Sequence, residues 1–134
     1  MKACAEAIID KLNERELKFQ QREDSDGDVI IHFYLDQKPI TIISTGDNGE
    51  YVQIVTHYEH VSDDKMTDML LLCNSLNAQY KWLKFAIDHD NDLMIFTDAI
   101  VDVDTAGDEV FELVARRAVM MDEIKPKIMR TLYL

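Results

Sequence analysis

The sequence predicts an α+β fold built on an antiparallel sheet. Segments with helical spacing and segments with strand alternation are grouped, in the order helix, three or four strands, helix, two strands, helix. The connections between successive strands are shorter than the dozen or so residues that a parallel crossover needs. Because helices and strands are segregated and do not alternate one for one, the α+β class follows. No linker, repeat or low-complexity stretch divides the chain, so we expect one domain over residues 1–134.

The first half of the chain predicts a short helix followed by a meander of strands. Residues 3–13 carry apolar side chains at helical spacing. The run "LKFQQRE" (17–23) alternates weakly, whereas "VIIHFYL" (29–35) places its alternate apolar residues on one face. The runs "PITIIST" and "YVQIVTHY" follow, and turn signals such as Asp26-Gly27 separate them.

The second half predicts a helix, two strands and a long final helix. Ser62 is a candidate N-cap for a helix that reaches about Ala78. The strands are "YKWLKFAID" (80–88) and "LMIFTDAIV" (93–101). Pro126 should kink or break the last helix, which begins near residue 105. Its predicted inward stripe comprises Val110, Leu113, Val114, Met121, Ile124, Ile128 and Leu132.

The acidic segment "FAIDHDNDLMIF" (85–96) lies between these two strands. A calcium-binding loop that starts at Asp88 would need glycine and glutamate where Leu93 and Ala99 stand. Asp and Asn tolerate positive φ better than other non-glycine residues. We therefore predict a metal-free, two-residue type I′ turn centred on Asp90-Asn91.

That turn would leave large apolar residues on both faces of the hairpin. One predicted face contains Leu83, Phe85, Ile87, Met94, Phe96 and Ile100. The opposite face contains Tyr80, Trp82, Ala86, Leu93 and Ile95, which we predict as a protein interface. Tyr80 and Trp82 are its expected anchors, since aromatic residues often dominate binding energy at interfaces. The alternative is that helices cover both faces of the sheet.

The segment "HYEH" is the best remaining candidate for metal binding or catalysis. It supplies His57, Glu59 and His60, with Asp63 and Asp64 nearby. Residues three apart on a strand point to opposite faces, so His57 and His60 converge only if the strand breaks between them. We therefore expect no metal ligands, no cofactor and no catalytic residues. A small metal-binding protein or enzyme that uses these five residues is the alternative.

Charge restricts the class of partner. The net charge is −12, with 26 acidic and 14 basic residues. This balance disfavours nucleic acids and anionic membranes, and it leaves a basic or amphipathic protein as the expected partner. The amino end acquires acidic residues too early for a signal peptide, so we expect a cytoplasmic protein. Cys4 and Cys73 should be reduced, buried thiols.

The stretch "LLLCNSLNAQYKWLKFAIDHDNDLMIFTDAIVD" resembles the central signature of the YbjN-like family of bacterial sensory transduction regulators, and "VMMDEIKPKIM" resembles its final helix. The residues that match the family pattern are Asn74, Asn77, Lys84, Phe85 and Asp88. Asn91 stands where the family usually has glycine. The resemblance covers residues 5–132 and is specific over 70–130.

The resemblance implies a fold like that of type III secretion chaperones, in which helices pack on a curved antiparallel sheet. It also implies that proteins of this kind are often homodimers and have no cofactor. From this and from the hairpin we expect a non-catalytic protein-binding module that acts as a regulator or a chaperone-like adaptor. A purely structural subunit of a larger assembly is a further alternative.

Overall fold

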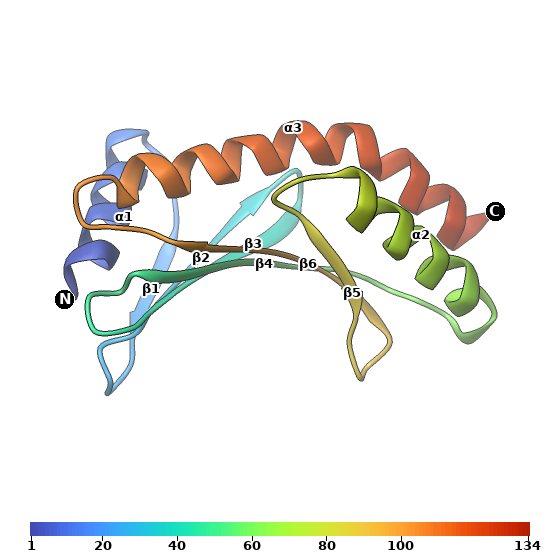
Figure 1. The fold of residues 1–134 in the computed structure, drawn as a ribbon, viewed down its shortest axis with the longest axis horizontal. Helices are drawn as coiled ribbons and strands as arrows, with labels where there is room; N and C mark the ends of the chain where they lie inside the picture. The colour runs from blue at the N-terminus through green and yellow to red at the C-terminus, as the bar shows by residue number, and fades with distance from the viewer.

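The computed structural model describes residues 1–134 as three α-helices and one six-stranded sheet (Figure 1). The helices are α1 (Ala3–Glu14), α2 (Met66–Gln79) and α3 (Ala106–Tyr133), and a short helical turn, η1 (Asp63–Lys65), precedes α2. The strands are β1 (Gln20–Glu23), β2 (Val29–Leu35), β3 (Lys38–Thr45), β4 (Tyr51–His60), β5 (Lys84–Ile87) and β6 (Asp92–Ile100). This order of elements confirms the predicted α+β class.

The sheet is antiparallel throughout, with the strand order β1-β2-β3-β4-β6-β5. Short turns join the first four strands, whereas the chain passes from β4 through η1, α2 and β5 before it returns in β6 beside β4. The sheet is curved, and its β1–β2 and β5–β6 hairpins bend away from the helices (Figure 1). The predicted curved antiparallel sheet is thereby confirmed.

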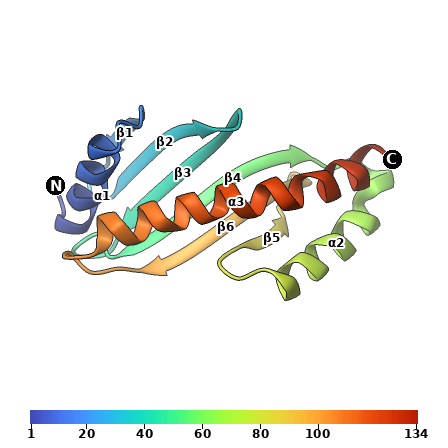
Figure 2. The same ribbon diagram turned by 90° about the horizontal axis from the view of Figure 1, so that it is seen from above.

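All three helices lie on one face of the sheet (Figures 1 and 2). α3 runs along the length of the sheet, with α1 and α2 at its two ends (Figure 2). Burial along β4 alternates accordingly: Val52, Ile54 and Thr56 are buried, whereas Gln53 and Val55 remain partly exposed. The alternative in which helices cover both faces is wrong.

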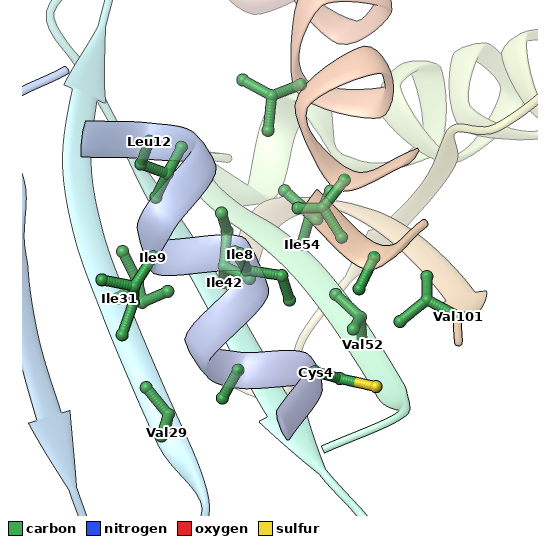
Figure 3. Packing of buried hydrophobic residues seen from close by; sticks show 14 of the residues in the cluster. Cys4, Ile8, Ile9, Leu12, Val29, Ile31, Ile42, Val52, Ile54 and Val101 are labelled. Carbon is green, nitrogen blue, oxygen red and sulfur yellow. The ribbon is translucent and has the colours of Figure 1, made fainter. Parts of the chain in front are cut away.

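Two apolar clusters form the core between the helices and the sheet. The first lies under α1 and the beginning of α3, where Ile8 and Leu12 face Ile31, Ile42 and Ile54 of the sheet (Figure 3). The second lies under α2 and the end of α3. The two clusters hold α3 along the whole length of the sheet.

α3 departs from the predicted stripe at three positions. Leu113 and Met121 are only partly buried, whereas Arg117 is 2% exposed and occupies a place on the buried stripe. The helix also continues through Pro126, so the predicted break does not occur. Burial of Ile124 and Ile128 on either side of the proline holds the helix on the sheet and outweighs the loss of one helical hydrogen bond.

The β5–β6 hairpin corrects the predicted register. Asp88 and Asp92 close a three-residue loop, since the Asp88 amide donates to the Asp92 carbonyl at 3.0 Å. Only Asn91 has a positive φ in this loop, at 63°, so the predicted type I′ turn is wrong. The Asp88 carboxylate accepts the amides of Asp90 and Asp92, each at 3.0 Å, and so stabilises the longer loop.

The extra loop residue exchanges the two faces of β6 relative to β5. Phe85 is paired with Ile95, and Ala86 with Met94. Leu93 and Ile95 are therefore 0% and 1% exposed beneath the helices, and the predicted hairpin faces are wrong. A change of one residue in a hairpin connection moves every side chain of the strand to the other face.

Candidate protein-binding site

The sheet face opposite the helices carries apolar side chains on five of its strands. We call it the open face, and it comprises Ile30, Ile43, Val55, Ala86, Met94 and Phe96, which are all partly exposed. Ile30 lies directly across from Ile43, and Val55 directly across from Phe96. Charged side chains lie among them: Arg22 is directly across from Ile30, and Lys84 lies 5.2 Å from the centroid of the Phe96 ring and 3.5 Å from Asp98. The apolar centre at Val55 and Phe96 is therefore bordered by an ion pair.

A second surface follows from the unequal lengths of β5 and β6. β5 pairs with β6 only as far as Phe96, so residues 97–100 of β6 have no strand on that side (Figure 2). A cleft of about 650 Å³ separates this unpaired part of β6 from the first turns of α3. We call this cleft the β6 groove. Its lining residues are Trp82, Asp98, Ala99, Ile100, Thr105, Asp108, Glu109, Glu112, Leu113 and Arg116.

Trp82 stands at the end of the β6 groove. Its side chain is 52% exposed, and the Arg116 guanidinium lies 5.3 Å from the centroid of the ring. Its φ is 65°, a value uncommon for a bulky residue, and its carbonyl accepts a hydrogen bond from the Thr97 hydroxyl. The backbone of Trp82 is thus held by the sheet while the ring stays accessible to a partner.

Acidic residues dominate the charge of the β6 groove. Four carboxylates and one guanidinium line it. Glu112 is paired with Arg116 at 2.8 Å, and Asp108 with Lys11 at 2.7 Å. The pKa of Asp108 is lowered because Lys11 donates a hydrogen bond to its carboxylate. Asp98 also lies 3.5 Å from Lys84, so Glu109 is the one lining carboxylate without an ion pair. Exposed apolar side chains lie beside it, including Ile100, which is 78% exposed.

The five residues predicted as one interface lie in four different places. Trp82 lines the β6 groove, and Ala86 lies on the open face. Tyr80 follows the end of α2 and is partly buried, with its hydroxyl enclosed. Leu93 and Ile95 belong to the core. The acidic lining of the groove was missed, because α3 and β6 are brought together only by the tertiary fold.

The residues of "HYEH" form a different cluster from the one predicted. A β-bulge between His57 and Glu59 breaks the strand register, so both imidazoles reach Asp92. Nε2 of His57 lies 2.6 Å and Nδ1 of His60 lies 2.7 Å from the two oxygens of Asp92. Hydrogen bonds from His60 and His57 lower the pKa of Asp92. Glu59 instead pairs with Lys38 at 3.3 Å.

The remaining predicted members do not join this cluster. Asp63 and Asp64 lie in η1, where the Ser62 hydroxyl donates to Asp64 at 2.6 Å. Asp88 does join it, since ligand atoms of His57, Asp88 and Asp92 all lie within 4.8 Å of one another. From the sequence we expected the two histidines to converge only if the strand breaks between them, and the bulge is such a break. The strand pattern alone does not reveal where the bulge lies.

The fold resembles solved type III secretion complexes. A chain of the Yersinia pestis secretion chaperone SycH in complex with a fragment of YscM2 has a TM-score of 0.56 and 11% identity, covering 87% of this chain and 98% of that one. A chain of the ExsC–ExsE complex has a TM-score of 0.57 and 9% identity, covering 92% and 96%. A chain of the ExoU–SpcU heterodimer of Pseudomonas aeruginosa has a TM-score of 0.52 and 15% identity, covering 84% and 92%.

These likenesses confirm the expected chaperone-like fold. None of the helices combines the length and apolar character needed to cross a bilayer. No curated protein matches the sequence. The model of one protein family matches residues 5–121, and its description reads "Putative bacterial sensory transduction regulator". The chain belongs to this family, YbjN.

Proposed function

We propose that this protein is a non-catalytic binding module that takes an extended, basic segment of a partner polypeptide into the β6 groove. The observation that carries the proposal is the unpaired part of β6, residues 97–100, which faces the groove. Unpaired strand edges offer backbone donors and acceptors to an added strand, and adjacent side chains then select the sequence.

The lining of the groove specifies the chemistry of that segment. Exposed Trp82 and Ile100 provide apolar contacts for alternate side chains of an added strand. The carboxylate of Glu109, which has no ion pair, favours lysine or arginine at an intervening position, whereas Asp98 and Glu112 are already paired with Lys84 and Arg116. The net charge of −12 acts in the same direction, because it accelerates encounter with a basic partner.

The structural neighbours support a polypeptide ligand. All three were solved as complexes with another protein or a fragment of one. Together with membership of a family of regulators, this supports a chaperone-like adaptor that acts through protein contacts.

Peptide selection tests the proposal directly. A random peptide library displayed on phage is selected against the intact protein, and binding of enriched peptides is followed by the fluorescence of Trp82, the only tryptophan. We expect enriched peptides to combine basic and apolar residues in alternation. A proline in the middle of such a peptide should abolish binding, because proline cannot donate a hydrogen bond to the strand edge.

Two charge reversals provide a matched comparison. Glu109→Lys changes the first turn of α3 inside the groove, and Glu6→Lys changes the first turn of α1 outside it. We expect Glu109→Lys to weaken binding at least about tenfold, the equivalent of 1.4 kcal/mol, and Glu6→Lys to leave it unchanged. Equal effects of both reversals, or peptides insensitive to both, would exclude the groove.

The open face supports a second, separate contact with another copy of the chain. Its apolar centre at Val55 and Phe96 is bordered by Lys84, which lies over the Phe96 ring and pairs with Asp98, so that an ion pair and not a lone carboxylate would lie between two acidic copies. We propose a homodimer that pairs these faces and leaves the β6 groove free for the partner polypeptide.

A second candidate function rests on His57, Asp88 and Asp92, whose ligand atoms all lie within 4.8 Å of one another. One imidazole and two carboxylates form a donor set for Zn²⁺. Zn²⁺ titrated calorimetrically into chelator-treated protein should bind one ion per chain. His57→Gln should abolish that binding, whereas His32→Gln, on β2, should not. If no saturable binding occurs in the unaltered protein, the cluster is only a hydrogen-bonded end of the sheet.

A further inference from the structure

The backbone groups that face the β6 groove follow from the pairing of β5. The Asn77 side chain holds both the amide and the carbonyl of Phe85, so these groups point away from β6. Phe85 is paired with Ile95, which therefore directs its own amide and carbonyl to β4. Because successive residues of a strand alternate in this direction, the backbone groups of Asp98 and Ile100 point away from β4 and into the groove.

A contact just beyond β6 agrees with this assignment. The Val101 amide donates to the Glu50 carbonyl at 2.9 Å, next to β4, so the backbone groups of Ile100 face the opposite side. No backbone hydrogen bond outside the helices and strands involves Asp98 or Ile100. The edge therefore offers the amide and the carbonyl of each of these two residues to an added strand.

The side of the sheet away from the helices is hollowed next to the same residues. A cleft of about 470 Å³, which we call the Tyr51 cleft, is lined by Ile43, Thr45, Tyr51, Val52, Gln53, Asp98, Ala99 and Ile100. It shares Asp98, Ala99 and Ile100 with the β6 groove, so both hollows border one strand edge. Tyr51 is the first residue of β4 and lies about 13 Å from Val55, at about 3.3 Å per residue, so the cleft is at the margin of the open face.

The walls of the Tyr51 cleft are mostly apolar. Tyr51 lies directly across from Ile100, and the two side chains are 54% and 78% exposed. Asp98 is the only charged residue of the lining, and it is already engaged. Gln53 donates to its carboxylate at 2.9 Å, and Lys84 lies 3.5 Å from it. The cleft therefore favours an uncharged, apolar side chain.

We infer that the partner segment carries a large apolar side chain next to its basic residue, and that this apolar side chain occupies the Tyr51 cleft. The inference rests on the proposed function and specifies its partner. Residues directly opposite each other in a ladder have their side chains on the same face of the sheet.

The alternation of β6 assigns each partner side chain to a face. Ale Ile100 side chain lies across from Tyr51, so the partner residue opposite Ile100 points into the Tyr51 cleft. Ala99 packs against the core beneath the helices, so the partner residue opposite Ala99 points towards α3 and Glu109. One added strand thus places an apolar side chain on one face of the sheet and a lysine or arginine on the other.

Two synthetic peptides test the apolar position. The first is acetyl-Lys-Thr-Lys-Phe-Lys-Thr-Lys-amide, whose order of residues is the same in both directions, so that phenylalanine lies between lysines whichever way the strand runs. The second has alanine in place of phenylalanine. Binding to the intact protein is followed by the fluorescence of Trp82, since neither peptide contains tryptophan. We expect the phenylalanine peptide to bind at least about tenfold more tightly, because its ring is removed from water in the cleft.

Three variants assign that gain to the Tyr51 cleft. Tyr51→Ala removes a wall of the cleft and should lose most of the gain, whereas Tyr51→Phe keeps the ring and should keep the gain. Tyr34→Ala is the matched control, since Tyr34 is 76% exposed on β2 and does not line the cleft. This variant should behave like the unaltered protein. All three variants should bind the alanine peptide as the unaltered protein does.

Hydrogen exchange followed by NMR tests which backbone groups the peptide pairs with. We expect the amides of Asp98 and Ile100 to exchange rapidly in the free protein and slowly in the complex with the phenylalanine peptide. The amides of Thr97 and Ala99 face β4 and should exchange slowly in both states.

The outcomes separate this inference from the proposed function. Equal affinity of the two peptides, or a gain that persists in Tyr51→Ala, would overturn the inference. If the amides of Asp98 and Ile100 are nevertheless protected by either peptide, the strand edge remains a binding site and the proposed function stands. If neither peptide binds and these amides stay unprotected, both fail.

Discussion

The hydroxyl of Thr97 accepts a hydrogen bond from Arg117 at 2.8 Å and donates its own proton to the Trp82 carbonyl. This one side chain connects the buried arginine of α3 with the loop that precedes β5. It is itself 3% exposed. The buried guanidinium of Arg117 and the end of the β6 groove are therefore joined through a single buried hydroxyl.

Substitution of Thr97 should reveal that connection. Thr97→Val keeps the shape of the side chain but leaves Arg117 with one fewer acceptor and the Trp82 carbonyl without this donor. We expect the free energy of unfolding in urea to fall by about 1–3 kcal/mol. Thr97→Ser retains both bonds and should lose less. Equal losses in the two variants would mean that packing of the methyl group, rather than the hydroxyl, is what matters.

The two asparagines of the family signature should differ in importance. Asn77 accepts from the Phe85 amide at 2.7 Å and donates to the Phe85 carbonyl at 2.9 Å, so it ties α2 to β5. Asn74 is exposed, one turn earlier on the same helix. Asn77→Ala should therefore lower the free energy of unfolding by about 1–3 kcal/mol, and Asn74→Ala by less than about 0.5 kcal/mol. Chemical denaturation of both variants decides, and a greater loss in Asn74→Ala would contradict this assignment.

Periodicity was sufficient for the fold class and the antiparallel sheet, because each element carries its own apolar pattern. It was insufficient for the β5–β6 register, which depends on whether the loop has two or three residues. The Asp88 side chain selects three, and this choice exchanges the faces of Leu93 and Ile95.

The candidate sites depended still more on tertiary structure. His57 and His60 converge through a bulge that the strand pattern does not reveal, and the β6 groove forms between distant segments. Arg117 had a visible signal: it lies three residues after Val114 and four before Met121, inside the helical stripe. A charged residue at such a position is a sign of a buried polar site.

Alkaline pH should destabilise the protein through Cys73. Burial raises the pKa of this thiol from 9.0 to about 11. The folded state therefore favours the protonated thiol, so this contribution is fully present below pH 9 and is lost as the pH rises towards 11. A tenfold change in ionisation corresponds to about 1.4 kcal/mol, which gives a loss of about 3 kcal/mol over that interval.

The measurement is the free energy of unfolding at pH 8 and pH 11 for the protein and for Cys73→Ala. The variant is less stable at pH 8 because of its smaller side chain, but it should lose less stability on going to pH 11. Effects of other groups that titrate in this range, including Cys4 and Tyr58, are common to both proteins and cancel. Parallel losses would show that Cys73 is ionised as readily in the folded state as in the unfolded one.

Self-association through the open face is the last prediction. Val55 lies on the central strand β4, directly across from Phe96, and a carboxylate introduced there would face the partner copy. In a dimer that pairs these faces, Val55→Glu would bury two like charges close to each other, at a cost of several kcal/mol. In a monomer the same side chain reaches solvent. Sedimentation at micromolar concentrations should therefore show a dimer for the unaltered protein and a monomer for Val55→Glu.

Leu71→Glu is the matched control, since it also places a carboxylate at an exposed apolar position. Leu71 is 66% exposed on α2, on the side of the sheet that bears the helices. This variant should remain dimeric. If Leu71→Glu loses the dimer and Val55→Glu keeps it, the contact lies on α2. If the unaltered protein is strictly monomeric, no second copy covers the open face.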